Sequence, residues 1–91
     1  MAVLRVSVIS PERVLYEGEA RSVVAPAYDG EVGILPSHAP MMAILGRGVL
    51  RVQAGGASGG VGETLRFQVE GGFLQVVDNQ VRVVTERASA A

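Results

Sequence analysis

The sequence predicts an all-β protein, a flattened β-sandwich or barrel of about ten short antiparallel strands. Glycine and proline interrupt the chain so often that, before residue 73, the longest stretch without either is Met1–Ser10. Helices of average length, about 11 residues, do not fit between these interruptions. What fits is a short strand, and several segments alternate apolar with polar residues, as a strand with one buried face does. Valine is abundant, and its branched side chain suits a pleated sheet.

The first half of the chain supplies six of the expected strands. Leu4, Val6 and Val8 alternate with polar residues, which gives the first strand one apolar face. The strands expected here are Leu4–Val8, Val14–Gly18, Ala20–Ala25, Glu31–Leu35, Met41–Leu45 and Val49–Gln53. Turns are expected at Gly18, Asp29-Gly30 and Gly46-Arg47-Gly48, because glycine adopts positive φ without steric cost and aspartate tolerates it.

The second half begins with a glycine-rich segment, Gly55–Gly62, in which five of eight residues are glycine. We interpret it as the mobile tip of a hairpin rather than a phosphate-binding loop, since neither a helix nor a Lys-Ser/Thr pair follows it. Thr64–Glu70 alternates as a strand, and Phe73–Val77 and Val81–Thr85 form two more around an Asp78-Asn79 turn. The tail from residue 86 is too short to form a stable helix by itself.

Composition excludes several classes of function. The net charge is −1, and the eight basic residues, all arginine, form no cluster, which disfavours binding to nucleic acid. The absence of cysteine excludes disulfides, thiolate nucleophiles and cysteine-bound zinc, and it favours an intracellular compartment. The N-terminus lacks signal-peptide character, and no run of 18 apolar residues exists, so contact with a membrane is expected only through a partner.

Catalytic chemistry is not expected. The only histidine, His38, lies in a loop bracketed by Pro36 and Pro40. An enzyme that uses His38 with Asp29 or Glu31 is an alternative, but no nucleophile elbow or set of metal-ligand spacings accompanies these residues. The sequence therefore predicts no catalytic residue, no metal site and no cofactor.

A binding function fits the same region better. A tight turn at Asp29-Gly30-Glu31 would hold its acidic side chains in solvent, where a partner could contact them. The adjacent Met41 and Met42 are interpreted either as core packing, which we favour, or as an adaptable contact surface. A β-sandwich module that binds a small ligand or carbohydrate is the alternative, disfavoured because aromatic residues are only 4% of the chain and tryptophan is absent.

Two blocks of sequence resemble a known family. Residues Ser22–Pro40 resemble the signature stretch of the epsilon subunit of F-type ATP synthase, and Phe67–Val76, Asp78-Asn79 and Val81–Arg87 resemble its second block. The resemblance runs from about Leu4 to Ala88. It implies a β-sandwich domain over residues 1–88 and a short tail, residues 89–91, where an α-helical hairpin begins in most bacterial members.

The resemblance also implies a function: a non-catalytic rotor subunit of the central stalk that couples the membrane c-ring to the gamma subunit during proton-driven ATP synthesis. Such a subunit is peripheral to the cytoplasmic face of the bacterial plasma membrane and has no cofactor of its own. The family's hairpin, with its inhibition of ATP hydrolysis and its nucleotide binding, is not carried over, because the sequence stops at Ala91.

Residues for two contact surfaces follow from the resemblance. Those that correspond to the c-ring contact are Asp29, Gly30, Glu31, Val32 and His38. Those that correspond to the gamma contact are Ser10, His38, Met41, Met42 and Ala43. Ser37 occupies a position where the family usually has glycine, so the backbone geometry of this loop is a point for the structure to decide.

Overall fold

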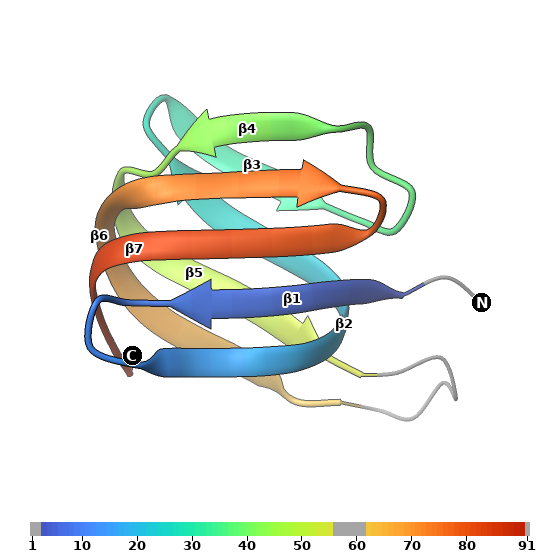
Figure 1. Cartoon of the computed structure of the whole chain (residues 1–91), viewed down its shortest axis with the longest axis horizontal. Coiled ribbons are helices and arrows are strands. Elements are labelled where there is room, and N and C mark those ends of the chain that lie inside the picture. The colour runs from blue at the N-terminus through green and yellow to red at the C-terminus, as the bar shows by residue number, and fades with distance from the viewer. Residues whose placement is uncertain (1–2, 56–61, 91) are drawn as a thin grey trace.

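Seven strands make up the computed structural model over the residues that it describes, 3–55 and 62–90 (Figure 1). They are β1 (Leu4–Ile9), β2 (Val14–Ala27), β3 (Gly30–Ile34), β4 (Met41–Ile44), β5 (Arg47–Ala54), β6 (Thr64–Val77) and β7 (Gln80–Ala90). Within these ranges no helix is long and apolar enough to cross a membrane. The predicted all-β class is confirmed.

Five of the strands close a barrel in the order β1-β7-β6-β5-β2, with β2 pairing back to β1. β3 extends the barrel beside β2, and β4 lies beside β6. Every pairing is antiparallel except β1 with β7, which is parallel, whereas the sequence predicts antiparallel strands throughout. The reason is geometric: strand directions cannot alternate all the way around a closed ring with an odd number of members, so one neighbouring pair must be parallel.

The described residues form seven strands rather than about ten, because in two places two expected strands are joined in one long strand. β2 includes both Val14–Gly18 and Ala20–Ala25, and β6 includes both Thr64–Glu70 and Phe73–Val77. Each long strand changes partners along its length. The first half of β2 pairs with β1 and its second half with β5 and β3, so one strand serves two layers of the structure (Figure 1).

The turn expected at Gly18 is wrong, since this glycine lies inside β2. A Cβ atom there would lie 3.1 Å from the hydroxyl oxygen of Tyr16, so glycine leaves room for the tyrosine ring. That hydroxyl donates a hydrogen bond of 2.7 Å to the carbonyl of Glu19. Glycine marks close approach as often as it marks a turn, and the sequence alone does not separate the two uses.

Tyr16 gives a pH-dependent prediction. Burial, and then the carboxylate of Glu19, raise the pKa of the Tyr16 hydroxyl above its ordinary 10.0, against a smaller opposing effect of Arg5. The folded state therefore holds this proton more tightly than the unfolded state, so the contribution to stability is lost as pH rises through the folded pKa. Urea unfolding from about pH 8 to about pH 11 should show a steeper alkaline loss of stability for the wild type than for Tyr16→Phe. Parallel curves would contradict this.

The other expected turns are confirmed or shortened. Gly30 has φ 134°, and Asp78 and Asn79 have φ 49° and 63°, as hairpin turns require. Between β4 and β5 the connection is only Leu45 and Gly46, and the remainder of the expected turn already belongs to β5. Most of the expected Gly55–Gly62 hairpin tip, residues 56–61, lies outside the described residues.

A double glycine forms the corner at which β6 changes neighbours from β5 to β4. Gly71 has φ 72° and Gly72 has φ 103°. The amide of Leu45 donates to the Gly72 carbonyl at 2.9 Å, and the amide of Gly71 donates to the Gly46 carbonyl at 3.2 Å. The short β4–β5 connection is thereby fastened to the bend in β6. This corner sets where β4, and every side chain on it, sits relative to the barrel.

The core fills the barrel with side chains from the alternating inward positions of the strands. Those almost fully buried are Leu4, Val6, Val8, Ala20, Val23, Ala25, Ile34, Leu45, Leu50, Val52, Val69, Leu74, Val76, Val81 and Val83. Thr85 is also buried, and its hydroxyl donates to the Arg87 carbonyl at 2.8 Å. β7 continues to Ala90, which pairs with Phe67, so residues 86–90 are strand. The domain limit at residue 88 stays a prediction.

Candidate functional site

The acidic turn expected at the β2–β3 hairpin is present and exposed. Tyr28 and Asp29 form the turn, with 82% of the tyrosine accessible, and Glu31 follows at the start of β3. An oxygen of Glu31 lies 3.4 Å from Nη2 of Arg51, with 58% and 40% of the two side chains accessible. An exposed pair of this kind contributes only about 0 to 1 kcal/mol, so it is easily exchanged for a pair with a partner. The turn therefore offers two carboxylates to an external cation.

His38 lies at the other end of β3. The loop that carries it joins β3 to β4. The four intervals from Gly30 to Ile34, at about 3.3 Å each, separate this loop from the acidic turn by about 13 Å. Nδ1 of His38 lies 2.7 Å from the Ala39 carbonyl, a contact in which the ring nitrogen donates. The structure does not bring His38 together with Asp29 or Glu31, which argues against the enzyme alternative.

The loop that carries His38 keeps left-handed backbone geometry without glycine. Ser37 has φ 69°, in the region that a non-glycine residue enters at a cost of about 1 to 2 kcal/mol. The amide of His38 closes a turn by donating to the Leu35 carbonyl at 3.2 Å. A serine here therefore adopts the left-handed geometry that a glycine would adopt without steric cost.

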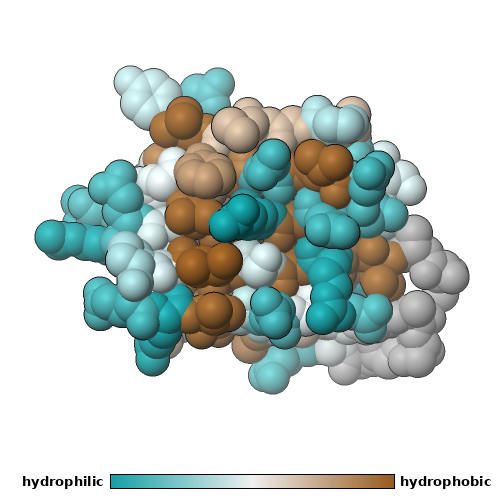
Figure 2. Space-filling view, in the orientation of Figure 1, coloured by the Kyte–Doolittle hydropathy of each residue, from teal (hydrophilic) through white to brown (hydrophobic). Residues whose placement is uncertain are grey.

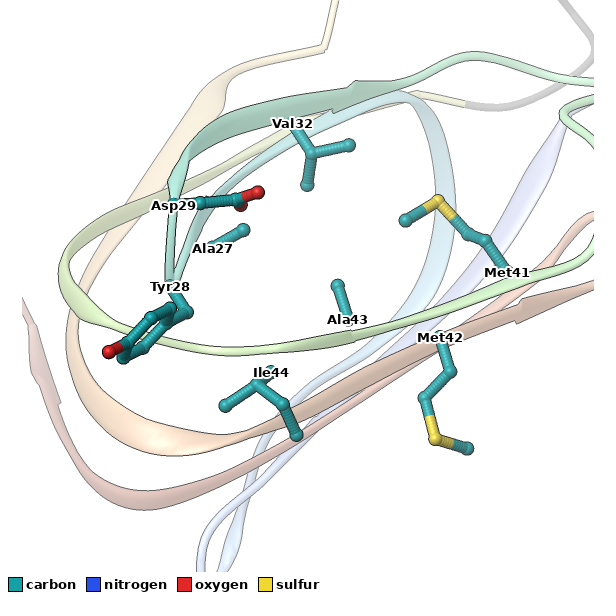
Figure 3. A pocket seen from close by; sticks show the side chains of 8 residues that line it. All are labelled: Ala27, Tyr28, Asp29, Val32, Met41, Met42, Ala43 and Ile44. Carbon is teal, nitrogen blue, oxygen red and sulfur yellow. The ribbon is translucent and has the colours of Figure 1, made fainter.

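β4 presents two different faces. Met41 and Ala43 are half-buried and pack against the core, whereas Met42 and Ile44 are 63% and 61% exposed. Figure 3 shows the first pair pointing toward Val32 and the second pair pointing away. Core packing is therefore confirmed for Met41, whereas Met42 is exposed and its part in a contact stays a prediction. Of the three β4 residues implied for a gamma contact, only Met42 projects from the outer face.

A groove of about 580 Å³ separates β4 from the β2–β3 hairpin. Its lining residues are Ala27, Tyr28, Asp29, Val32, Met41, Met42, Ala43 and Ile44 (Figure 3). The volume is in the range of small-molecule pockets, but such pockets orient their ligands with several convergent polar groups. Here only Tyr28 and Asp29 among the lining residues carry polar side-chain atoms, and both are exposed. The groove gives little support to the small-ligand alternative.

The outer face of the sheet formed by β4, β6, β7, β1 and the start of β2 carries a continuous line of apolar residues. Successive cross-strand partners in this line are Ile44, Phe73, Val84, Ile9 and Val14, which we call the apolar row. Figure 2 shows this face, where a band of hydrophobic surface crosses the strands. With neighbouring strands about 4.8 Å apart, four intervals make the row about 19 Å long.

The apolar row does not belong to the core. Val84 lies between two inward-facing residues, Val83 and Thr85, so it faces outward, and Ile44 and Val14 are 61% and 55% exposed. Apolar side chains lined up on a surface in this way usually mark a contact with another protein. The sheet face behind them supplies a rigid base.

Both ends of the apolar row meet residues that the sequence implicates in binding. At one end the amide of Tyr28, in the acidic turn, donates to the Ile44 carbonyl at 2.8 Å. At the other end Ser10 follows Ile9, and its amide and hydroxyl both donate to the Arg13 carbonyl, at 2.9 Å and 3.2 Å. The row therefore joins Ser10 to the acidic turn across the whole sheet.

None of the five members of the row is among the expected contact residues. A signal was present, because each of the pairs Val8-Ile9, Phe73-Leu74 and Val83-Val84 places two apolar residues in succession and so breaks the alternation. In a strand, one residue of such a pair must face outward. That these residues form a line depends on strand register, which the sequence does not state.

Comparisons with known proteins agree with the resemblance. The profile of a family described as "ATP synthase, Delta/Epsilon chain, beta-sandwich domain" matches residues 3–91. The ATP synthase epsilon chain of Leptospira borgpetersenii serovar Hardjo-bovis (strain JB197) is 48% identical over 87 residues, which are 94% of this chain and 63% of that one. The chloroplastic epsilon chain of Chlamydomonas reinhardtii is 35% identical, over 97% of this chain and 62% of its own. The chain thus spans less than two thirds of the length of these relatives.

Solved structures share the fold. A chain in the cryo-EM structure of Euglena gracilis mitochondrial ATP synthase superposes with a TM-score of 0.85 at 22% identity, over 99% of this chain and 54% of that chain. A chain in the structure of the central stalk and c-ring of Tetrahymena thermophila mitochondrial ATP synthase gives a TM-score of 0.73 at 15% identity, over 96% and 66%. At these identities the likeness concerns the fold alone.

Proposed function

Because this chain belongs to the ATP synthase delta/epsilon family, and corresponds to its β-sandwich domain, we propose that it is a non-catalytic subunit of the central stalk of an F-type ATP synthase. In this role it binds the gamma subunit on one surface and the c-ring on another, and so transmits rotation between them. It sits at the cytoplasmic face of a bacterial plasma membrane and reaches the membrane only through the ring.

The observation that carries this proposal is the apolar row. A subunit that turns with the stalk needs a stable interface with it. The centre of a stable interface is depleted of charge and rich in large apolar groups. Apolar side chains on a rigid sheet meet this requirement. We assign the gamma contact to the row together with Ser10 and Met42, with Met41 and Ala43 supporting them from the groove side. His38 joins this surface because its loop leads directly into β4.

The c-ring contact is assigned to the turn formed by Asp29, Gly30, Glu31 and Val32. Its two exposed carboxylates favour a ring surface that offers arginine or lysine, because opposite charges steer association and fix orientation. His38, which the resemblance also implies for this contact, lies at the far end of β3, and the gamma surface suits its position better.

Charge reversal at Glu31 tests the division into two surfaces. Glu31→Lys is expected to weaken binding to purified c-ring by about 10-fold at low salt, because an attractive contact becomes repulsive, and the loss should shrink at high salt, which screens both contacts. Binding to the gamma subunit should be unchanged. Both affinities can be measured by surface plasmon resonance at two salt concentrations.

Glu63→Lys is the matched control, since it makes the same charge change at an exposed residue on the β5–β6 connection. It should leave both affinities unaltered. Equal loss of ring binding in the two variants would mean that net charge matters and the acidic turn does not. Wild-type chain that binds neither gamma nor the ring would refute the proposed function.

A further inference from the structure

The loop that carries His38 is tied to a hairpin 42 residues further along the chain. The side-chain oxygen Oδ1 of Asn79 accepts a hydrogen bond of 2.6 Å from the amide of Ser37. Asn79 is the second residue of the β6–β7 turn, and its main-chain carbonyl accepts a hydrogen bond of 2.8 Å from the amide of Arg5, next to β7 in the barrel. One residue therefore fastens the loop to the barrel wall.

The bond falls where the loop most needs support. Ser37 is the loop residue with positive φ, a conformation that a serine in a free chain seldom adopts. Residues 35–40 also cross from β3, which pairs with β2, to β4, which pairs with β6, so strand pairing does not hold the loop. A strained residue persists only where its surroundings determine it, and here the Asn79 side chain adds a contact from outside the loop to the turn bond between His38 and Leu35.

We propose that Asn79 is a positioning residue for gamma binding: by holding the amide of Ser37, it keeps the loop in the conformation that presents His38. This inference rests on the proposed function above. It gives the β6–β7 turn an indirect part in docking, through the loop that Asn79 holds. Without the hydrogen bond, the loop samples other conformations, and the apparent affinity falls in proportion to the fraction that remains competent.

The turn itself allows a selective test. Both turn residues have left-handed geometry, and glycine at the second position of such a turn is as favourable as asparagine. Asn79→Gly should therefore keep the hairpin and the main-chain bond to Arg5 while removing only the side-chain acceptor. Asn79→Asp keeps an acceptor oxygen at the same place and is the conservative control.

Amide hydrogen exchange measured by NMR on the isolated chain tests the bond directly. In Asn79→Gly the Ser37 amide should exchange at least about 10-fold faster than in the wild type, because its acceptor is lost, whereas the Arg5 amide should keep its protection. Asn79→Asp should resemble the wild type at both amides. Unchanged exchange at Ser37 in Asn79→Gly would overturn the inference.

Binding to the purified gamma subunit tests the consequence. Asn79→Gly should raise the dissociation constant by about 3- to 10-fold, with an unchanged midpoint of thermal unfolding, and Asn79→Asp should restore binding to within about twofold of the wild type. If Asn79→Gly lost the Ser37 protection but bound gamma as tightly as the wild type, Asn79 would have no part in docking. Wild-type chain that fails to bind gamma would instead refute the proposed function, and the exchange experiment would still report on the bond.

Discussion

Replacing Gly72 with alanine is expected to destabilise the fold strongly. An added Cβ would lie 1.9 Å from the carbonyl oxygen of Val84 and 2.8 Å from Cα of Thr85, and both of these are backbone atoms that cannot move aside. The φ of 103° adds strain for any residue with a side chain. We expect a loss of at least about 3 kcal/mol, out of a total of about 5 to 10 kcal/mol for a domain of this size. Chemical denaturation followed by circular dichroism measures this loss.

Gly33→Ala is the matched control for this substitution. Gly33 is also a strand glycine, but nothing lies within 4 Å of the position that its Cβ would occupy. Alanine there should leave stability unchanged or raise it by up to about 1 kcal/mol, because it reduces the entropy of the unfolded chain. If both variants lost stability equally, the close approach of β6 to β7 at Gly72 would not be the cause.

Val84→Glu is expected to abolish binding to the gamma subunit. Val84 is the centre of the apolar row, and a carboxylate at the centre of an apolar interface is buried without a partner, which costs several kcal/mol. The dissociation constant should rise at least about 100-fold, equivalent to about 2.7 kcal/mol. The fold should survive, because residue 84 faces outward. Titration calorimetry with purified gamma subunit measures the affinity, and circular dichroism checks the fold.

Val49→Glu is the matched control. It shows whether binding is lost because the apolar row is disrupted or because any outward-facing valine is replaced by glutamate. Val49 is likewise half-buried at an outward position of β5, which is not among the strands of the row. Val49→Glu should lose about as much stability as Val84→Glu, because both place glutamate in a strand, and it should still bind gamma. Loss of binding in both variants, or in neither, would contradict the assignment of the gamma contact to the apolar row.

The strands were largely predictable because each one is a local pattern. Leu4, Val6 and Val8 alternate with polar residues whatever the rest of the chain does, and the sheet buries all three. Gly18 and the Gly71-Gly72 pair show the limit of this reasoning. The sequence marks a change at each, but whether a glycine ends a strand, bends it or makes room for a neighbour depends on what lies opposite.

The acidic turn was predictable for the same local reason, since Asp29-Gly30 contains its own turn chemistry, and its exposure followed. The grouping of His38 with that turn could not be judged from nearness in sequence, because the intervening residues form an extended strand. The opposite faces of Met41 and Met42 follow from period two once β4 is known to be a strand. Which of them faces the groove is decided by the pairing of β4 with β6.

The sequence by itself determined the all-β class, the places of most strands, the acidic turn and, through two blocks of residues, the family. Only the tertiary structure decided that the barrel closes with a parallel pair, that Ile9, Val14, Ile44, Phe73 and Val84 form one row, and that Asn79 holds Ser37. The physical reason is the range of the interactions. Backbone propensity and alternation act over a few neighbouring residues, whereas closure, register and the bond from residue 37 to residue 79 join segments whose separation in sequence leaves no local trace.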